Sequence, residues 1–263
     1  MDLLAADDPA PAVAEKTGAD SPFLVVCDHA GRAVPRRLGR LGLPEEAFEA
    51  HIAWDIGALT LARRLSAALE ACLIHQRYSR LVIDCNRDPD HDQSIVPVSD
   101  GWRIPGNEGL DHAGAAARRR EVFDPYHARI ATEIDARLAR GRSTILVLVH
   151  SFTPAMAGLA RPWHVGVLHL GGSPASSAML DLLRAEPGLV VGDNEPYAMD
   201  GTDYTAPFHA HLRGCDAVEL EVRQDLLQDA LSADRMAELF IRLLPRLVDG
   251  GRHGRRINEG SAA

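Results

Sequence analysis

The sequence predicts an α/β protein in which helices flank a mostly parallel or mixed central sheet. Short apolar runs rich in β-branched residues alternate with segments of helical periodicity, a pattern typical of a sheet covered by helices. The chain has 263 residues, of which 46% are hydrophobic, and this is enough to bury one substantial core. Because no low-complexity linker or internal repeat divides it, we expect a single domain over residues 21–249.

The two ends of the chain are expected to lie outside this domain. Residues 1–20 are rich in Ala, Asp and Pro with little periodicity, which predicts a disordered leader. Residues 250–263 begin with Gly-Gly-Arg-His-Gly-Arg-Arg and are expected to form a disordered tail.

Strands are expected where short apolar runs are bounded by turn-forming residues. Side chains alternate between the two faces of a strand, so Arg80, Asp84 and Asn86 would share one face of the third of these strands. Residues 88–110, rich in Pro, Gly, Asp and Asn, are expected to be irregular. In chain order, the expected strands are 23–27, 72–75, 80–87, 145–149, 164–170, 189–191 and 217–223.

Helices are expected where apolar side chains recur every three or four residues. Pro44 opens the first of them, with Glu45 and Glu46 suiting the helix dipole. Pro125 is expected to break or restart a long helix that Gly141 ends, and Ser232 to cap the last one. After the helix opened by Pro44, the expected helices are 56–69, 115–140, 176–185 and 232–247.

Charge and hydropathy exclude several classes of partner. The net charge of −9 argues against nucleic acid or an anionic membrane surface, which favour a basic face. The chain has no apolar stretch near the ~18 to 20 residues that span a bilayer. It also lacks the basic region and apolar core of a signal peptide, so we expect a cytoplasmic protein with a small-molecule substrate.

Histidines and carboxylates gather at the expected strand ends, where open parallel sheets bind their ligands. Two histidines and a carboxylate would leave one position open on a Zn²⁺ ion, which lowers the pKa of a water molecule to about 7. A separate glutamate could then transfer the proton. The alternative is that the histidines cap or hydrogen-bond loops, since neither an HExxH nor a CxxC pattern occurs. The residues concerned are His29, Asn86, Arg87, His150, Asn194, Glu219 and Glu221.

The other candidates also have structural alternatives. Asp55 could act only as a carboxylate at a helix N-terminus, and Glu221, between two apolar residues, could pair with an arginine. Asn86 and Arg87 together present several donors, which suits recognition of a carboxylate. Arg87 could instead pair with an aspartate at the surface.

Several short motifs occur in a fixed order along the chain, and in this order they resemble the N-formylglutamate amidohydrolase family over about residues 22–230. The most specific of them is Ser79-Arg80-x-x-x-Asp84-x-Asn86-Arg87. The others are Asp28-His29-Ala30-Gly31 with Pro35, Trp54-Asp55, Pro125-Tyr126-His127, His150-Ser151-Phe152, Asn194-x-Pro196-Tyr197 and Val218-x-x-Glu221-x-Arg223.

The resemblance implies a fold like that of the zinc carboxypeptidases and aspartoacylase. It also implies Zn²⁺-dependent hydrolysis of N-formyl-L-glutamate to formate and L-glutamate, a step of histidine degradation. It assigns His29 and His150 to the metal, Asn86 and Arg87 to the carboxylate of a small acidic N-acyl amino acid, and Glu221 to the general base. Arg80 would polarise the scissile carbonyl or hold a carboxylate.

Two positions depart from the patterns of the family and its relatives. The first motif usually reads Pro-His-Ser-Gly in the family, whereas here it is Asp28-His29-Ala30-Gly31. Carboxypeptidase relatives take a glutamate ligand three residues after the first histidine, where this chain has Arg32, so Asp55 is the substitute ligand. The alternatives are a hydrolase of another N-acyl amino acid, or a non-catalytic relative that binds a metal or an acidic ligand.

Overall fold

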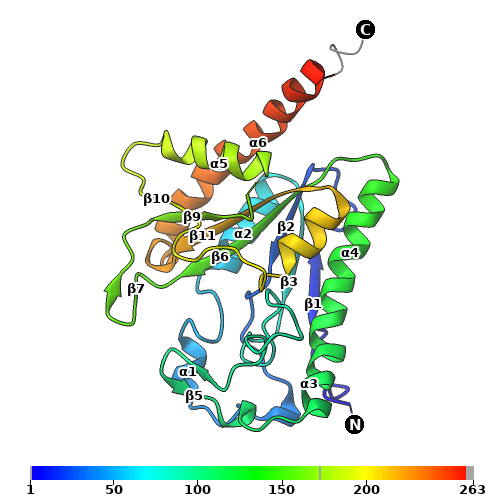
Figure 1. Ribbon diagram of the computed structural model, residues 1–263, viewed down its shortest axis with the longest axis vertical. Coiled ribbons are helices and arrows are strands. Elements are labelled where there is room, and N and C mark those ends of the chain that lie inside the picture. The colour runs from blue at the N-terminus through cyan, green and yellow to red at the C-terminus, as the bar shows by residue number, and fades with distance from the viewer. Residues whose placement is uncertain (1, 172, 259–263) are drawn as a thin grey trace.

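A seven-stranded mixed sheet lies between two layers of helices and loops (Figure 1) in the computed structural model, which describes residues 2–171 and 173–258. The strand order is β1-β3-β2-β6-β11-β9-β10. The four central strands, β3, β2, β6 and β11, are parallel, whereas β1 and β9 run antiparallel to their central neighbours. Their bounds are β1 Ala12–Glu15, β2 Phe23–Cys27, β3 Cys72–Gln76, β6 Ile145–Phe152, β9 Val165–Leu168, β10 Val191–Asp193 and β11 Asp216–Arg223.

Helices cover both faces of this sheet (Figure 1). Apolar residues of α2, α5 and α6 pack against one face, and those of α4 with several loops pack against the other. The α-helices are α1 Glu45–Glu49, α2 Ala58–Ala68, α3 His112–Arg118, α4 Asp124–Ala139, α5 Pro174–Arg184 and α6 Ala230–Asn258, and a π-helical turn, Arg119–Phe123, joins α3 to α4. Two small hairpins, β4 Val98–Ser99 with β5 Trp102–Arg103 and β7 Ala155–Met156 with β8 Leu159–Ala160, stand outside the sheet.

The central strands are apolar on both faces because both faces are covered. In β2, Phe23 and Val25 belong to the core under α2 and α6, whereas Leu24 and Val26 belong to the core under α4. The sequence therefore reads as a continuous apolar run rather than as an alternating one.

The predicted fold class is confirmed, and five of the seven expected strands are present near their expected bounds. The strand expected over 189–191 lies two residues later, at Val191–Asp193. The expected strand over 80–87 is wrong, because that segment forms turns. Leu81, Val82 and Ile83 are buried, but the carbonyls of the first two accept hydrogen bonds from side chains instead of from a neighbouring strand. The carbonyl of Leu81 accepts from Asn107 at 3.0 Å, and that of Val82 from Arg118 at 2.9 Å.

The long helix restarts at Pro125, as expected, since this proline lies in the first turn of α4. The last helix begins earlier than expected, at Ala230. Asp229 rather than Ser232 caps it, because the Asp229 carboxylate accepts from the Ser232 amide at 2.9 Å. Among the described helices, none combines the length and apolar character needed to cross a membrane.

The expected disorder at the two ends differs from the structure. Within residues 1–20, strand β1 pairs with β3 at the sheet edge, and Leu3 is buried. The low apolar content hid this strand, which has only one neighbour in the sheet. At the other end, helix α6 continues to Asn258, so the expected tail differs over 250–258. Residues 259–263 lie outside the described residues.

Candidate active site

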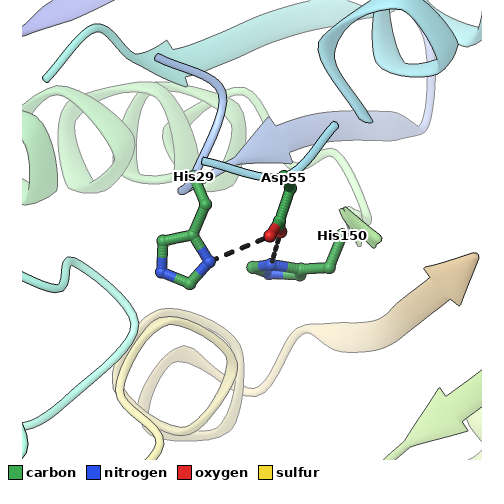
Figure 2. A group of neighbouring side chains, drawn as sticks. All are labelled: His29, Asp55 and His150. Carbon is green, nitrogen blue, oxygen red and sulfur yellow. Dashed lines mark hydrogen bonds and ion pairs between the residues drawn. The ribbon is translucent and has the colours of Figure 1, made fainter. Parts of the chain in front are cut away.

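Three buried side chains that are distant in sequence, His29, Asp55 and His150, meet at one point (Figure 2). One potential ligand atom from each lies within 4.8 Å of the other two. Oδ2 of Asp55 lies 3.4 Å from Nδ1 of His29 and 2.9 Å from Nδ1 of His150. Both rings therefore turn the same nitrogen towards one carboxylate oxygen.

The parallel strands bring these residues together. His29 follows the end of β2, and His150 lies in the adjacent strand β6. Asp55 lies between α1 and α2, where its amide donates to the carbonyl of His29 at 2.9 Å. The three positions therefore depend on neighbouring strands and one backbone hydrogen bond.

A second carboxylate lies behind each histidine. Nε2 of His29 lies 2.7 Å from Oδ1 of Asp84, and Nε2 of His150 lies 3.3 Å from Oδ2 of Asp28. Such carboxylates fix the tautomer and orientation of metal-binding histidines. For His29, this contact is a hydrogen bond that leaves Nδ1 for a ligand. For His150, the contact with Asp28 is one of charge, because neither Nε2 nor Oδ2 has a hydrogen-bond partner.

Tyr126 and Thr205 hold Asp28 in place. The hydroxyls of both residues donate to Oδ1 of Asp28, at 2.8 and 3.0 Å. The other carboxylate oxygen is therefore the one that faces His150.

The donor set fits a divalent metal ion. Two ligand atoms of a tetrahedral zinc site with bonds near 2.05 Å would be about 3.3 Å apart, close to the two distances from Asp55 Oδ2. Nδ1 of His29 is also buried without a hydrogen-bond partner, which is costly unless something else binds it. Two imidazoles and one carboxylate form a ligand set that binds Zn²⁺ and also several other divalent metals.

Burial and nearby charges shift the pKa values of His29 and His150 in opposite directions. Burial, reinforced by the charge of Arg80, lowers the pKa of His29 to about 4. Burial also disfavours the charged form of His150, but Asp28, Glu219 and Glu221 outweigh it and raise that pKa to about 9. Metal ligation requires neutral imidazole, so His29 is ready to bind, whereas His150 must first release a proton.

Two glutamates of β11 face the same pocket, in which both of them lie buried. Glu221 is the neighbour of His150 in the register between β11 and β6. Oε1 of Glu219 accepts a hydrogen bond from the side-chain amide of Asn86 at 3.3 Å. Oε2 of each glutamate has no hydrogen-bond partner. Burial raises the pKa of Glu219 to about 8 and also raises that of Glu221. A general base near neutral pH needs such a raised pKa.

Arg80, Asn86 and Arg87 line this pocket as well, but all three already have partners within the protein. Arg80 forms an ion pair with Asp55, while its Nε atom is buried without a partner. Arg87 forms an ion pair with Asp203. Asn86 accepts from the amide of Thr205 at 3.0 Å. The predicted carboxylate-binding residues are at the site, but their donors are partly occupied.

Two residues considered in the sequence analysis do not line this pocket. They are Arg32, at the position of the carboxypeptidase glutamate ligand, and Asn194, at the end of another expected strand. Arg32 forms an ion pair with Glu49 and stacks over Trp54, with 5.3 Å between its guanidinium carbon and the ring centre. Asn194 bonds to the backbone of His169.

Sequence reasoning missed several residues at the site. Asp84 is part of the most specific motif but was given no role, and Asp28 was taken only as a departure from the family pattern. His51 and Tyr197 also line the pocket. Nδ1 of His51 lies 3.6 Å from Asp55 Oδ1, four residues away, and this spacing is the one signal that could have indicated it.

Gly166 of β9 allows the segment that carries Tyr197 to approach the site. A Cβ atom at this position would lie 2.0 Å from the carbonyl oxygen of Glu195 and 3.4 Å from the Cβ of Glu221. Since the first contact is with backbone, only glycine fits here. This close approach places Tyr197 beside the glutamates of β11.

A comparison with family models identifies the family of this chain. A sequence model of N-formylglutamate amidohydrolase matches residues 21–228. No curated protein matches the chain.

Two solved structures share the fold of this chain. The gene product Atu2144 of Agrobacterium tumefaciens is 35% identical, with a TM-score of 0.91 over 95% of this chain and 99% of its own. N-formylglutamate amidohydrolase from Ralstonia eutropha shares the fold at 18% identity, with a TM-score of 0.67 over 94% of this chain and 100% of its own. The chain therefore belongs to the N-formylglutamate amidohydrolase family.

Proposed function

We propose that this protein is a metal-dependent amidohydrolase that cleaves the amide bond of an N-acyl amino acid. The observation that supports it most is the buried His29–Asp55–His150 cluster, in which a second carboxylate lies behind each histidine. His29, Asp55 and His150 would hold one divalent ion, for which Zn²⁺ is our candidate. When bound, such an ion supplies a Lewis acid and lowers the pKa of water.

Glu221 would act as the general base and acid. It would take a proton from the water that attacks the amide carbon and deliver it to the leaving nitrogen as the C–N bond breaks. Its burial beside His150 and its raised pKa support this role. Glu219 also has a free carboxylate oxygen in the pocket, so the assignment needs a test of both.

Arg80 is proposed to orient the substrate carbonyl, since its buried Nε atom has no partner in the pocket. Asn86 and Arg87 would bind a carboxylate of the substrate. For Arg87, this requires the carboxylate to share or replace the contact with Asp203.

N-formyl-L-glutamate is the first candidate substrate, and it would place the enzyme in histidine degradation, in the cytoplasm. Another N-acyl amino acid is the second candidate, and the ion pair between Arg87 and Asp203 favours it, because this pair reduces the attraction for a second carboxylate. On either view, the partner is a small molecule rather than nucleic acid or a membrane.

Formate release from N-formyl-L-glutamate, measured with added Zn²⁺ and with a chelator, tests the proposal. We expect release that the chelator abolishes and Zn²⁺ restores. N-acetyl and N-carbamoyl glutamate and the matching aspartates identify the acyl group and the amino acid. A metal-loaded protein that binds glutamate but hydrolyses none of these compounds would instead be a non-catalytic binding relative.

A further inference from the structure

A second, larger pocket adjoins the catalytic pocket and shares His51, Arg80 and Tyr197 with it. The volume of this outer pocket is about 400 Å³, whereas that of the catalytic pocket is about 40 Å³. A water molecule needs about 10 to 15 Å³ of cavity volume, so the catalytic pocket has room for about three water molecules. A substrate with more than a few atoms beyond its scissile amide must therefore extend into the outer pocket.

Much of the wall of the outer pocket is apolar, and it comes from separate parts of the chain. Ile52 and Ile56 lie between α1 and α2, Trp102 comes from β5, and Met156 comes from β7. Met156 is 42% exposed, so it offers apolar surface that a ligand could cover. Concave sites of about 300 to 1,000 Å³ with such walls are typical of small-molecule binding.

The charges around the outer pocket nearly compensate one another. Glu49 and Asp100 are exposed acidic residues that line it. Arg80, which also lines it, already forms an ion pair with Asp55. Glu49, however, forms an ion pair with Arg32, and the guanidinium of Arg161 contacts Tyr197 and Met156 on the same wall. The feature that distinguishes this pocket is therefore its apolar surface, which includes Ile56 and Trp102.

The junction between the pockets is held in a defined geometry. The Tyr197 hydroxyl accepts from Arg161 at 2.9 Å, and the same guanidinium lies over the tyrosine ring, 4.7 Å from its centre. Arg80 is held by Asp55. A substrate that fills both pockets would pass between these side chains and reach Glu221 with its amide.

We propose that the outer pocket is a specificity site that binds a largely apolar substituent next to the scissile amide. The inference rests on the proposed amidohydrolase function and narrows its substrate class. The substituent could belong to the acyl group or to the amino acid, and a substrate panel separates these two sources.

The panel consists of N-formyl-L-glutamate, N-hexanoyl-L-glutamate and N-formyl-L-phenylalanine, each assayed with the Zn²⁺-loaded protein. A single methylene in an apolar pocket changes kcat/KM by about tenfold or more. We expect at least one of the two apolar substrates to exceed N-formyl-L-glutamate by about tenfold in kcat/KM. N-formyl-L-glutamate as the best substrate would overturn the inference and leave the proposed function standing, whereas no hydrolysis of any of the three would overturn both.

A matched pair of variants tests the location of the site. Ser99 lines the outer pocket, whereas its neighbour Val98 in the same strand, β4, is 52% exposed and does not line it. Adjacent strand residues face opposite ways. Ser99→Trp should lower kcat/KM for the preferred apolar substrate about tenfold more than it lowers kcat/KM for N-formyl-L-glutamate, and Val98→Trp should change neither. Equal losses for both substrates in Ser99→Trp would contradict the assignment.

Ligand binding gives a readout that does not depend on turnover. In the Zn²⁺-loaded Glu221→Gln variant, isothermal titration should show a Kd at least about tenfold lower for the preferred apolar substrate than for N-formyl-L-glutamate. Adding Met156→Trp, which fills the pocket from the exposed hairpin strand β7, should remove this difference. A difference that survives Met156→Trp would place the apolar group elsewhere.

Discussion

Replacing Asp28 by Asn should weaken metal binding without removing any ligand. Tyr126 and Thr205 donate to Oδ1 of Asp28, so the side-chain oxygen of the asparagine would keep that place. The amide NH2 would then face Nε2 of His150, which carries a hydrogen when Nδ1 binds the metal. Two donors would meet where a carboxylate now lies 3.3 Å from the ring.

The expected size of the effect follows from the loss of that carboxylate. Loss of such outer partners of a metal ligand lowers metal affinity by about 10- to 100-fold. We therefore expect the Kd for Zn²⁺ to rise by this factor in Asp28→Asn, measured by competition with a chromophoric chelator. Tyr126→Phe keeps the carboxylate and should give a smaller rise.

Urea unfolding of the metal-free proteins provides the control, because Asp28 is only 1% exposed and its replacement also affects stability. The comparison of Kd values is valid if both variants remain folded at the assay temperature. A Kd for Asp28→Asn within about twofold of wild type would refute the role of Asp28 in orienting His150.

Three further predictions concern catalysis, the metal and pH. Glu221→Gln should lower kcat by about 10² to 10⁴-fold with metal content unchanged; if Glu219→Gln alone shows this loss, Glu219 is the base. His150→Ala should lose bound metal by elemental analysis, and a full metal equivalent would contradict its role as a ligand. Burial lowers the pKa of His127 to about 4 and of His209 to about 3, below about 6.5 in the unfolded chain. Their contribution to stability is therefore complete above pH 6.5 and falls as the pH decreases. Between pH 7.5 and 5, each histidine should lower the free energy of unfolding by about 2 kcal/mol. In the double variant His127→Gln/His209→Gln, urea unfolding should not show this decrease.

The strands that carry the metal cluster were predictable because their apolar runs are buried on both faces of the sheet. That His29 and His150 meet also followed from general rules, since the carboxyl ends of parallel strands form a common edge. The position of Asp55 did not follow, because it depends on a backbone hydrogen bond to His29 outside any regular element.

The segment 80–87 shows why an apolar run can be buried without forming a strand. Arg118, the first of three consecutive arginines in the sequence, is only 1% exposed. Its guanidinium donates to the carbonyls of Val82 and Gly106 and to the side chain of Asn107. These partners lie 36, 12 and 11 residues away, and sequence periodicity carries no information about contacts of that range.

The carboxylates behind the two histidines show the same limit. Asp84 lies 55 residues from His29, and nothing in its local sequence distinguishes it from a loop aspartate. Resemblance to the family drew attention to the motif around Asp84, but only the three-dimensional arrangement shows which ring it holds.

The absence of strand pairing over 80–87, apart from a single bridge between Arg87 and Asp203, has an evolutionary consequence. Arg80, Asn86 and Arg87 project from this segment, which is fixed mainly by side chains, whereas His150 and Glu221 belong to two paired strands of the sheet. Substitutions in the segment can therefore alter substrate recognition while the catalytic framework keeps its register, as is common for loops on a rigid scaffold. Divergence within one family can then change the accepted amide before it changes the chemistry.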